Sequence, residues 1–460
     1  MTGRLSASGH PLLVLAIATW AMIMLATPTG LRAQNKTNDV QNEPAPKARP
    51  TIQPSDARLA PYASDPNHLW NRLHRVLFVR TAPDGSAHIH STDPLLYGGG
   101  TFLLEGERHR RAVALLDQLL AEPENQSVID ALRRLVFQHD LWAAFDYLAW
   151  YPDDWVFHSW HEPAAIALRT RLSNVISRLA LSEREFDALP DNYEQAVKSK
   201  QFAATHDPEH SERPFLPTEL FQPDGSWVRF HETTANPMAT RHFEGAGGRA
   251  VHIIFLRLPG GRRATQRYLR DLRGDSVKQF PPGTMTAMVR RALAVDRSAK
   301  VRVTSLTELV QLRVYRRIPA DRRSNHQVHF GEQDMYEFVL DRGVLFAGQP
   351  GLRAVGPDDS AEPFERSAGD PFERTNRRPV DRQLKTCIAC HHAPGVHSIN
   401  SMERGLREGS GETFRTYDLA VETNFTVATK VKQFNWDLLR GMLEARRADG
   451  AARPEKQPAR

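Results

Sequence analysis

The feature that most constrains this chain is its use of cysteine. Among 460 residues there are only two cysteines, and both lie in the pentapeptide Cys387-Ile388-Ala389-Cys390-His391. A secreted chain stabilised by disulfides would have cysteine pairs spread through its sequence. The fold must therefore depend on an ordinary hydrophobic core, and the cysteine pair is present for its chemistry.

The spacing Cys-x-x-Cys followed at once by His is the attachment pattern of a c-type haem. In this chemistry two thiols bond to the porphyrin vinyl groups as thioethers. The histidine then places an imidazole nitrogen against the iron as its proximal ligand. The sequence thus predicts one covalently attached haem c, with Cys387 and Cys390 as the thioether residues and His391 as the iron ligand.

Two other interpretations of the motif stay open. A thioredoxin-like redox pair would follow a strand early in a βαβ unit, and no such pattern surrounds Cys387. A zinc site would need two further ligands, for which His392 and His397 are nearby candidates. The gap from Cys390 to these histidines is shorter than a zinc finger requires, so haem is the favoured interpretation.

Residues 1–33 have the pattern of a secretory signal peptide. Arg4 precedes an apolar run, residues 11–26, and Ala33 is a small residue suited to cleavage. The run is shorter than the roughly 20 apolar residues of a membrane span. We expect an exported protein, periplasmic or otherwise extracytoplasmic, with membrane association only if the segment is retained as an anchor.

Composition and periodicity divide the rest of the chain. Residues 34–66 are polar and proline-rich, which predicts a disordered tether. Residues 67–205 show helical spacing of apolar side chains, so a mainly helical domain is expected there. The predicted helices cover 107–121, 127–150 and 163–181, and Ser182 with Glu185 forms a capping box that opens a further short helix.

Residues 214–355 predict a mixed, strand-rich domain. β-Branched and aromatic residues are concentrated, between turn signals, in the segments 226–231, 250–258, 301–304, 310–318 and 336–346. Residues 380–460 contain the cysteine motif and a closing helix that begins near Ala428. The expected fold class is α+β and multidomain, with a helical N-terminal region, a strand-rich middle domain and a small, mainly α C-terminal haem domain.

The pentapeptide at 387–391 resembles the haem-binding motif of the c-type cytochromes. The resemblance implies a cytochrome c-like domain over 380–460, with one haem and a distal methionine ligand in many members. No methionine lies between Glu403 and Gly441. Met402 is the first candidate for the distal ligand, followed by His397, and Met442 is more typical of a core methionine. A ligand from the upstream domains, or an open iron position, stays open.

The expected function is one-electron transfer outside the cytoplasm, with a redox partner protein. The alternative is a haem-dependent oxidoreductase (peroxidase-like) or a haem-based ligand sensor with an open sixth iron position, so the sequence does not decide whether the chain is an enzyme. The formal net charge of +6 comes from interleaved arginines and acids without a dense basic block, which gives no support to a nucleic-acid partner.

Overall fold

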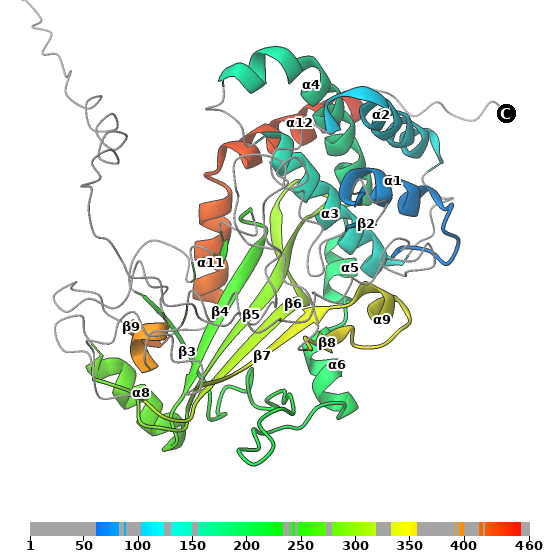
Figure 1. Cartoon of the computed structure of the whole chain (residues 1–460). Helices are drawn as coiled ribbons and strands as arrows, with labels where there is room; N and C mark the ends of the chain where they lie inside the picture. The colour runs from blue at the N-terminus through cyan, green and yellow to red at the C-terminus, as the bar shows by residue number, and fades with distance from the viewer. Residues whose placement is uncertain are drawn as a thin grey trace, which may run out of the picture. The chain divides into compact units, whose positions relative to one another are not determined.

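The computed structural model of the chain describes residues 61–81, 87–88, 103–123, 130–149, 155–232, 239, 242–243, 247–272, 278–318, 333–356, 391, 395–399, 414–416 and 419–451. All of them belong to one compact unit, Thr51–Arg460. An antiparallel sheet and a set of helices build this unit (Figure 1). The predicted α+β class is therefore confirmed, whereas the domain boundaries and the C-terminal haem domain stay predictions.

The described strands form a seven-stranded antiparallel sheet and a separate pair. The order in the sheet is β8 (Leu352–Ala354), β7 (Gln333–Leu340), β6 (Val301–Tyr315), β5 (Thr284–Val295), β4 (Ala250–Arg257), β3 (Val228–Glu232) and β9 (Phe414–Thr416). The separate pair is β1 (Arg80–Thr81) with β2 (Ala87–His88). Strands β3 to β8 follow one another along the chain, but β9 returns from the C-terminal region to pair with β3.

The two faces of the sheet differ in chemistry because side chains alternate along each strand. One face is uniformly apolar where Val251, Val289, Val310 and Phe338 pack in a single core cluster. On the opposite face, apolar residues such as Met288 of β5, Leu309 of β6 and Val339 of β7 alternate with polar residues of β4 to β7. This mixed face positions the candidate site described below.

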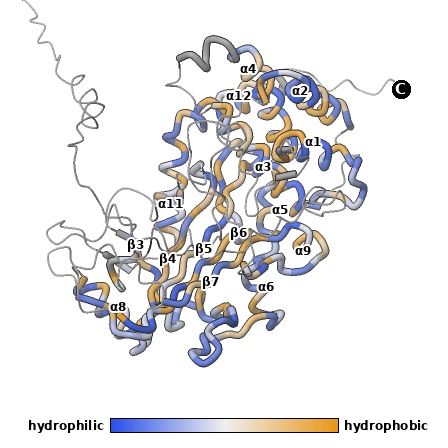
Figure 2. Tube along the Cα trace, viewed as in Figure 1, coloured by the Kyte–Doolittle hydropathy of each residue, from blue (hydrophilic) through white to orange (hydrophobic). Residues whose placement is uncertain are grey.

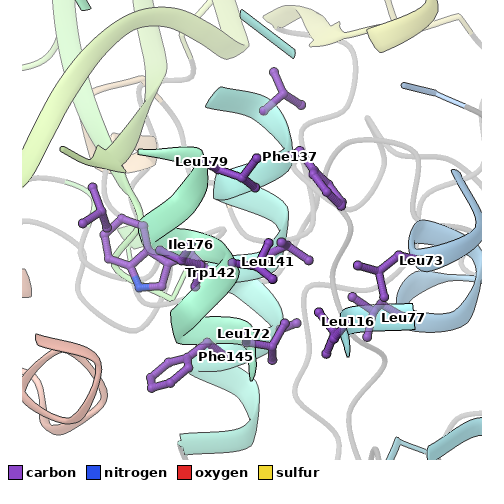
Figure 3. Packing of buried hydrophobic residues seen from close by; sticks show 14 of the residues in the cluster. Leu73, Leu77, Leu116, Phe137, Leu141, Trp142, Phe145, Leu172, Ile176 and Leu179 are labelled. Atoms are coloured by element: carbon purple, nitrogen blue, oxygen red, sulfur yellow. The ribbon is translucent and has the colours of Figure 1, made fainter. Parts of the chain in front are cut away.

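Helices cover one end of the sheet (Figure 1). They are α1 (Leu69–Phe78), α2 (Gly106–Ala121), α3 (Ala131–Ala149), α4 (Trp155–Leu179) and α12 (Phe434–Ala451). Figure 3 shows residues of this core, with Phe137 and Trp142 of α3 together with leucines of α1, α2 and α4. The same core contains Leu293 and Val301 from the β5–β6 hairpin and Trp436 from α12. Elements from all three predicted domains thus share one core.

The remaining helices lie around the sheet. They are α5 (Glu183–Asp187), α6 (Asn192–Ser199), α8 (Gly261–Asp271), α9 (Arg342–Phe346) and α11 (Leu419–Lys430), and α11 packs on β4 and β6. Figure 2 shows α8 as mostly hydrophilic, in keeping with its arginines. Within the described ranges, no helix is both long enough and apolar enough to cross a membrane.

Several predicted elements are confirmed, and others are wrong. Helices α2 and α3 and strands β3 and β4 lie close to their predicted positions. Helix α4, predicted to begin at residue 163, begins at Trp155 and contains Pro163 in its interior. The segments 301–304 and 310–318 belong to one strand, β6, rather than two. The predicted strand 336–346 ends at Leu340, because the Asp341 side chain accepts a hydrogen bond from Val344 N at 3.1 Å and caps helix α9. Near residue 428 the chain forms two helices, α11 and α12, instead of one.

Folded structure also begins earlier than residue 67. Tyr62, within the range predicted as a tether, is only 2% exposed. Its ring lies 4.7 Å from that of Phe137, and its hydroxyl donates a hydrogen bond to Asp140. Residues 34–60 lie outside the described residues.

Candidate functional site

Polar side chains line the mixed face of the sheet over its central strands. His252 on β4 is opposite Arg290 on β5, and Gln311 on β6 is opposite Glu337 on β7, where the amide donates to the carboxylate at 3.3 Å. Strand alternation places all four on one face. His252 is 2% exposed and Arg290 is 4% exposed, so this polar surface is covered by other parts of the chain.

A short segment from the C-terminal third docks on this face. It contains the 3₁₀ helix η3 (Gly395–Ser398), whose Ser398 is fully buried. Arg313 of β6 donates to Ser398 O at 2.7 Å, and the Tyr315 hydroxyl lies 2.7 Å from Ser398 Oγ. At the other end of η3, Val396 N donates to Gln279 Oε1 at 2.8 Å. Side chains of the sheet and of its flanking loop thus fix the segment in place.

His391 is attached to the same structure through its ring and its backbone. Its Nδ1 lies 2.7 Å from Ser398 O, and its carbonyl accepts a hydrogen bond from Gln333 Nε2 at 2.9 Å. A carbonyl can only accept, so Nδ1 carries a proton and donates it to Ser398 O.

Two further histidines stand beside His391. The ring of His242 is nearly parallel to that of His391, at 16°, with 6.1 Å between the ring centroids. The ring of His252 lies 5.9 Å from that of His242 and is tilted by 44°. His242 precedes β4 in the chain, so three imidazoles meet from the β3–β4 connection, from β4 and from the cysteine motif.

The surroundings keep the upstream imidazoles neutral. Burial, with the positive charges of Arg290 and Arg313, lowers the pKa of His242 to about 4. Burial and the neighbouring His242 hold the pKa of His252 well below its ordinary value. Both rings are therefore neutral at neutral pH.

A buried ionic network continues from this site into the helical layer. Glu308 of β6 pairs with Arg290 at 3.2 Å and with His139 of α3 at 3.1 Å. Burial raises the pKa of Glu308, but the neighbouring His139 and Arg290 outweigh that effect and hold it at about 2. The carboxylate therefore stays ionised and anchors Arg290 beside His252.

The structure describes only some of the residues singled out in the sequence. Cys387, Cys390, His392 and Met402 lie outside the described residues, and the side chain of His397 is likewise not described. His391 lies in the site. Met442 packs against the helical core, as expected of a core methionine. Among the residues that the structure describes, no group of three or more His, Cys, Asp or Glu side chains is arranged to hold a metal ion.

Sequence reasoning missed His242 and His252. His252 had a usable signal, because it is the only polar residue in the apolar run 250–256 of a predicted strand. His242 lies in a connection without periodicity, and only the folded chain brings it to His391.

A second concave region is separate from the histidines. A cavity of about 360 Å³ lies beside β3 and α8, and its lining includes Trp227, Arg229, Arg262 and Gln266. None of the three histidines lines it.

Comparison of the chain with known protein families, curated proteins and solved structures found no match.

Proposed function

We propose that this chain is an exported, mono-haem c-type protein that transfers one electron at a time outside the cytoplasm. Cys387 and Cys390 would hold the haem as thioethers, and His391 would bind its iron. The observation that supports this most directly is the hydrogen bond from His391 Nδ1 to the buried carbonyl of Ser398. A metal-binding histidine almost always donates its other ring N–H in this way, which fixes its tautomer and orientation.

The other described residues fit a haem in chemical type. The iron would supply a reversible one-electron couple, and the protein would hold and orient it. Arg313 and Arg290 place positive charge close to the histidines, which suits a cofactor with anionic carboxylates. The apolar cluster on the same face includes Val396 of η3, which is fully buried in the same 3₁₀ helix as His391's partner Ser398. Apolar and cationic side chains thus both lie near His391.

The orientation of His391 depends on a chain of fixed contacts. Ser398 O accepts from both His391 Nδ1 and Arg313, and Ser398 Oγ donates to Gly395 O at 2.8 Å. The carbonyl that the imidazole contacts is thereby held both by the sheet and within η3. Such preorganisation lowers the rearrangement that accompanies a change in iron charge, which favours electron transfer.

Export through the segment 1–33 is part of the proposal. The haem would then be attached outside the cytoplasm, where a redox partner protein would reach it. Fractionation of a native host, with the haem-stained chain in the extracytoplasmic fraction, checks this point.

The test of the function is covalent haem. Full-length protein matured together with c-haem attachment machinery should keep its haem on a denaturing gel, visible as a haem-stained band. Cys387→Ala with Cys390→Ala should lose the stain, because both thioether bonds are removed. Each single variant should keep at most one thioether, visible as a shifted alkaline pyridine haemochrome spectrum.

A matched pair of histidine variants separates ligation from general damage. His391→Ala should alter the iron spectrum even where thioethers form, whereas His392→Ala should leave it unchanged. Absence of stain from the wild type, while a known c-type cytochrome matures in the same cells, would refute the haem proposal and return the cysteine pair to thiol redox or zinc.

A further inference from the structure

The cavity beside β3 and α8 lies where α8 packs against the edge of the sheet formed by β3 and β9 (Figure 1). Its volume of about 360 Å³ falls in the range of about 300–1,000 Å³ that is typical of small-molecule sites. Both apolar and polar residues line it, among them Leu220, Trp227, Val228, Arg229, Arg262 and Gln266. Such a lining suits a ligand that is itself partly apolar and partly polar.

The ionisable groups of this lining are all positive among the described residues. Arg229 and Arg262 line the cavity, and no described acidic residue does. Neither arginine forms an ion pair within the described part of the chain. Glu219, which precedes the lining residue Leu220, uses its carboxylate elsewhere, since its Oε2 accepts from Ser226 N at 2.9 Å and from Ser226 Oγ at 2.8 Å. Two guanidinium groups therefore face one cavity without a carboxylate from the described residues.

Arg262 is held in place by two backbone carbonyls. Its Nη1 donates to Gly225 O at 3.0 Å and to Trp227 O at 2.9 Å, which fixes the second residue of α8 to the start of β3. Its Nε and Nη2 groups have no acceptor among the described residues. Neutral carbonyls leave the charge of the guanidinium uncompensated, so the remaining N–H groups are oriented in advance for an anion.

Arg229 is bound more loosely. Its Nη2 lies 3.5 Å from Phe221 O, at the limit of a hydrogen bond, and its guanidinium carbon is 6.0 Å from the centre of the Phe255 ring. Both contacts are weak, so this side chain has most of its hydrogen-bonding capacity left for a ligand.

We propose that this cavity binds a small molecule with an apolar body and one anionic group, a carboxylate or a phosphate. Arg229 and Arg262 bind the anionic group, because guanidinium forks match the oxygens of carboxylates and phosphates. Trp227 and Val228 contact the apolar body. The site is independent of the haem proposal, since none of the three histidines lines the cavity.

The first test uses the full-length wild-type chain and three probes that share one ring. Isothermal titration calorimetry should show that benzoate or phenyl phosphate binds at one site per chain. Benzamide, which has the shape of benzoate but no charge, should bind at least about tenfold more weakly, because it lacks the charge-assisted hydrogen bonds. The tighter of the two anions identifies the ligand class as carboxylate or phosphate. Equal affinity for benzamide and benzoate, or no saturable binding of either anion, would overturn the proposal.

Variants locate the bound anion. Arg229→Gln should weaken binding of the tighter anion by about tenfold, and Arg262→Gln by at least as much. Arg229→Gln is the decisive variant, because Arg262 also holds the backbone at Gly225 and Trp227. Its thermal unfolding, followed by circular dichroism, should match that of the wild type.

Arg267→Gln is the matched control, since Arg267 is an exposed arginine of α8 that does not line the cavity. It should change the dissociation constant by less than about twofold at physiological salt, where exposed charges are screened. Equal weakening by Arg267→Gln and Arg229→Gln would place the anion on the outer surface of α8 and overturn the assignment of the cavity. Unchanged binding in Arg229→Gln would overturn it as well.

Discussion

At the scale of single residues, Gly395 determines how the segment after the cysteine motif can dock. Its φ of +54° lies in the left-handed region that side chains disfavour. A Cβ built there would stand 2.1 Å from Gln279 Oε1, the atom that accepts a hydrogen bond from Val396 N. A larger residue would thus strain the backbone and displace the contact that fixes η3.

We expect Gly395→Ala to lower the free energy of unfolding by about 2–3 kcal/mol, at the upper end of the cost of a left-handed non-glycine residue. Urea unfolding measures it. Gly348→Ala is the control, because Gly348 has a φ of +79° but no atom within 4 Å of its Cβ position. Equal decreases in the free energy of unfolding of the two variants would mean that the clash with Gln279 does not add to the destabilisation.

Of the three histidines in the site, only His391 could be predicted from the sequence. His391 could be proposed from the sequence because the pattern that predicts its role spans only five residues. His242 and His252 have no local pattern with His391, and their proximity is produced by strand pairing between β4 and β5 and by the docking of η3 on β6. Contacts of this kind depend on tertiary structure, which periodicity does not encode.

At the scale of elements, helix α5 is stabilised both by its own capping box and by an ion pair with a residue distant in the sequence. The predicted capping box is confirmed, with Glu185 Oε2 accepting from Ser182 N at 2.8 Å and from Ser182 Oγ at 2.7 Å. Arg134 of α3 forms an ion pair with the other carboxylate oxygen. Burial alone would raise the pKa of Glu185, but the bonds from Ser182 and Arg134 outweigh it and lower the pKa to about 2.

Glu185→Gln should therefore cost about 1–2 kcal/mol of stability at neutral pH. The folded-state pKa lies below the ordinary value, so the stabilisation is complete above pH 4.5 or so and is lost as the pH falls toward about 2. Urea unfolding of the native protein and the Glu185→Gln variant across this range should show that the difference between their free energies of unfolding disappears in acid. Glu183 lies on the same helix, and its side chain is 78% exposed. Glu183→Gln should therefore leave the free energy of unfolding nearly unchanged at every pH in this range.

Strand β5 was not predicted, and its composition explains why. The stretch 285–294 contains methionine, alanine, leucine and two arginines, all good helix formers, and shows little alternation. Pairing with β4 and β6 on both sides nevertheless makes it a central strand. Register shifts near Arg290 and Arg291 leave the two arginines to pair with Glu308 and Asp191 respectively, and tertiary partners thus override the local preference.

At the scale of the molecule, a buried cluster ties the C-terminal helices to the N-terminal ones. Lys430 of α11 is fully buried and donates to Asp146 of α3 at 2.7 Å and to Gly247 O at 2.9 Å. Arg249 also pairs with Asp146, at 3.0 Å. The Lys430 ammonium lies 5.0 Å from the ring of Trp142. Regions far apart in the sequence are therefore joined through one charged group.

Lys430→Met should lower the free energy of unfolding by about 3 kcal/mol, the lower end for breaking a buried pair, because Asp146 keeps Arg249. Thermal unfolding followed by circular dichroism should still show one transition, at a lower temperature, since the regions share one core. Lys198→Met, which removes a 71% exposed partner of Glu194, should change stability by less than about 1 kcal/mol. Two separate transitions in the Lys430 variant would show that the C-terminal helices melt independently.

The pairing of β9 with β3 also has a consequence for biosynthesis. Glu232 pairs with Phe414, so this edge of the sheet gains its last strand only after the chain has passed the cysteine motif. Regions made earlier generally fold first. If the proposed haem is attached, the motif would thus be available to an attachment enzyme before the closing strand has emerged. Chain connectivity would then allow cofactor insertion to precede completion of the sheet.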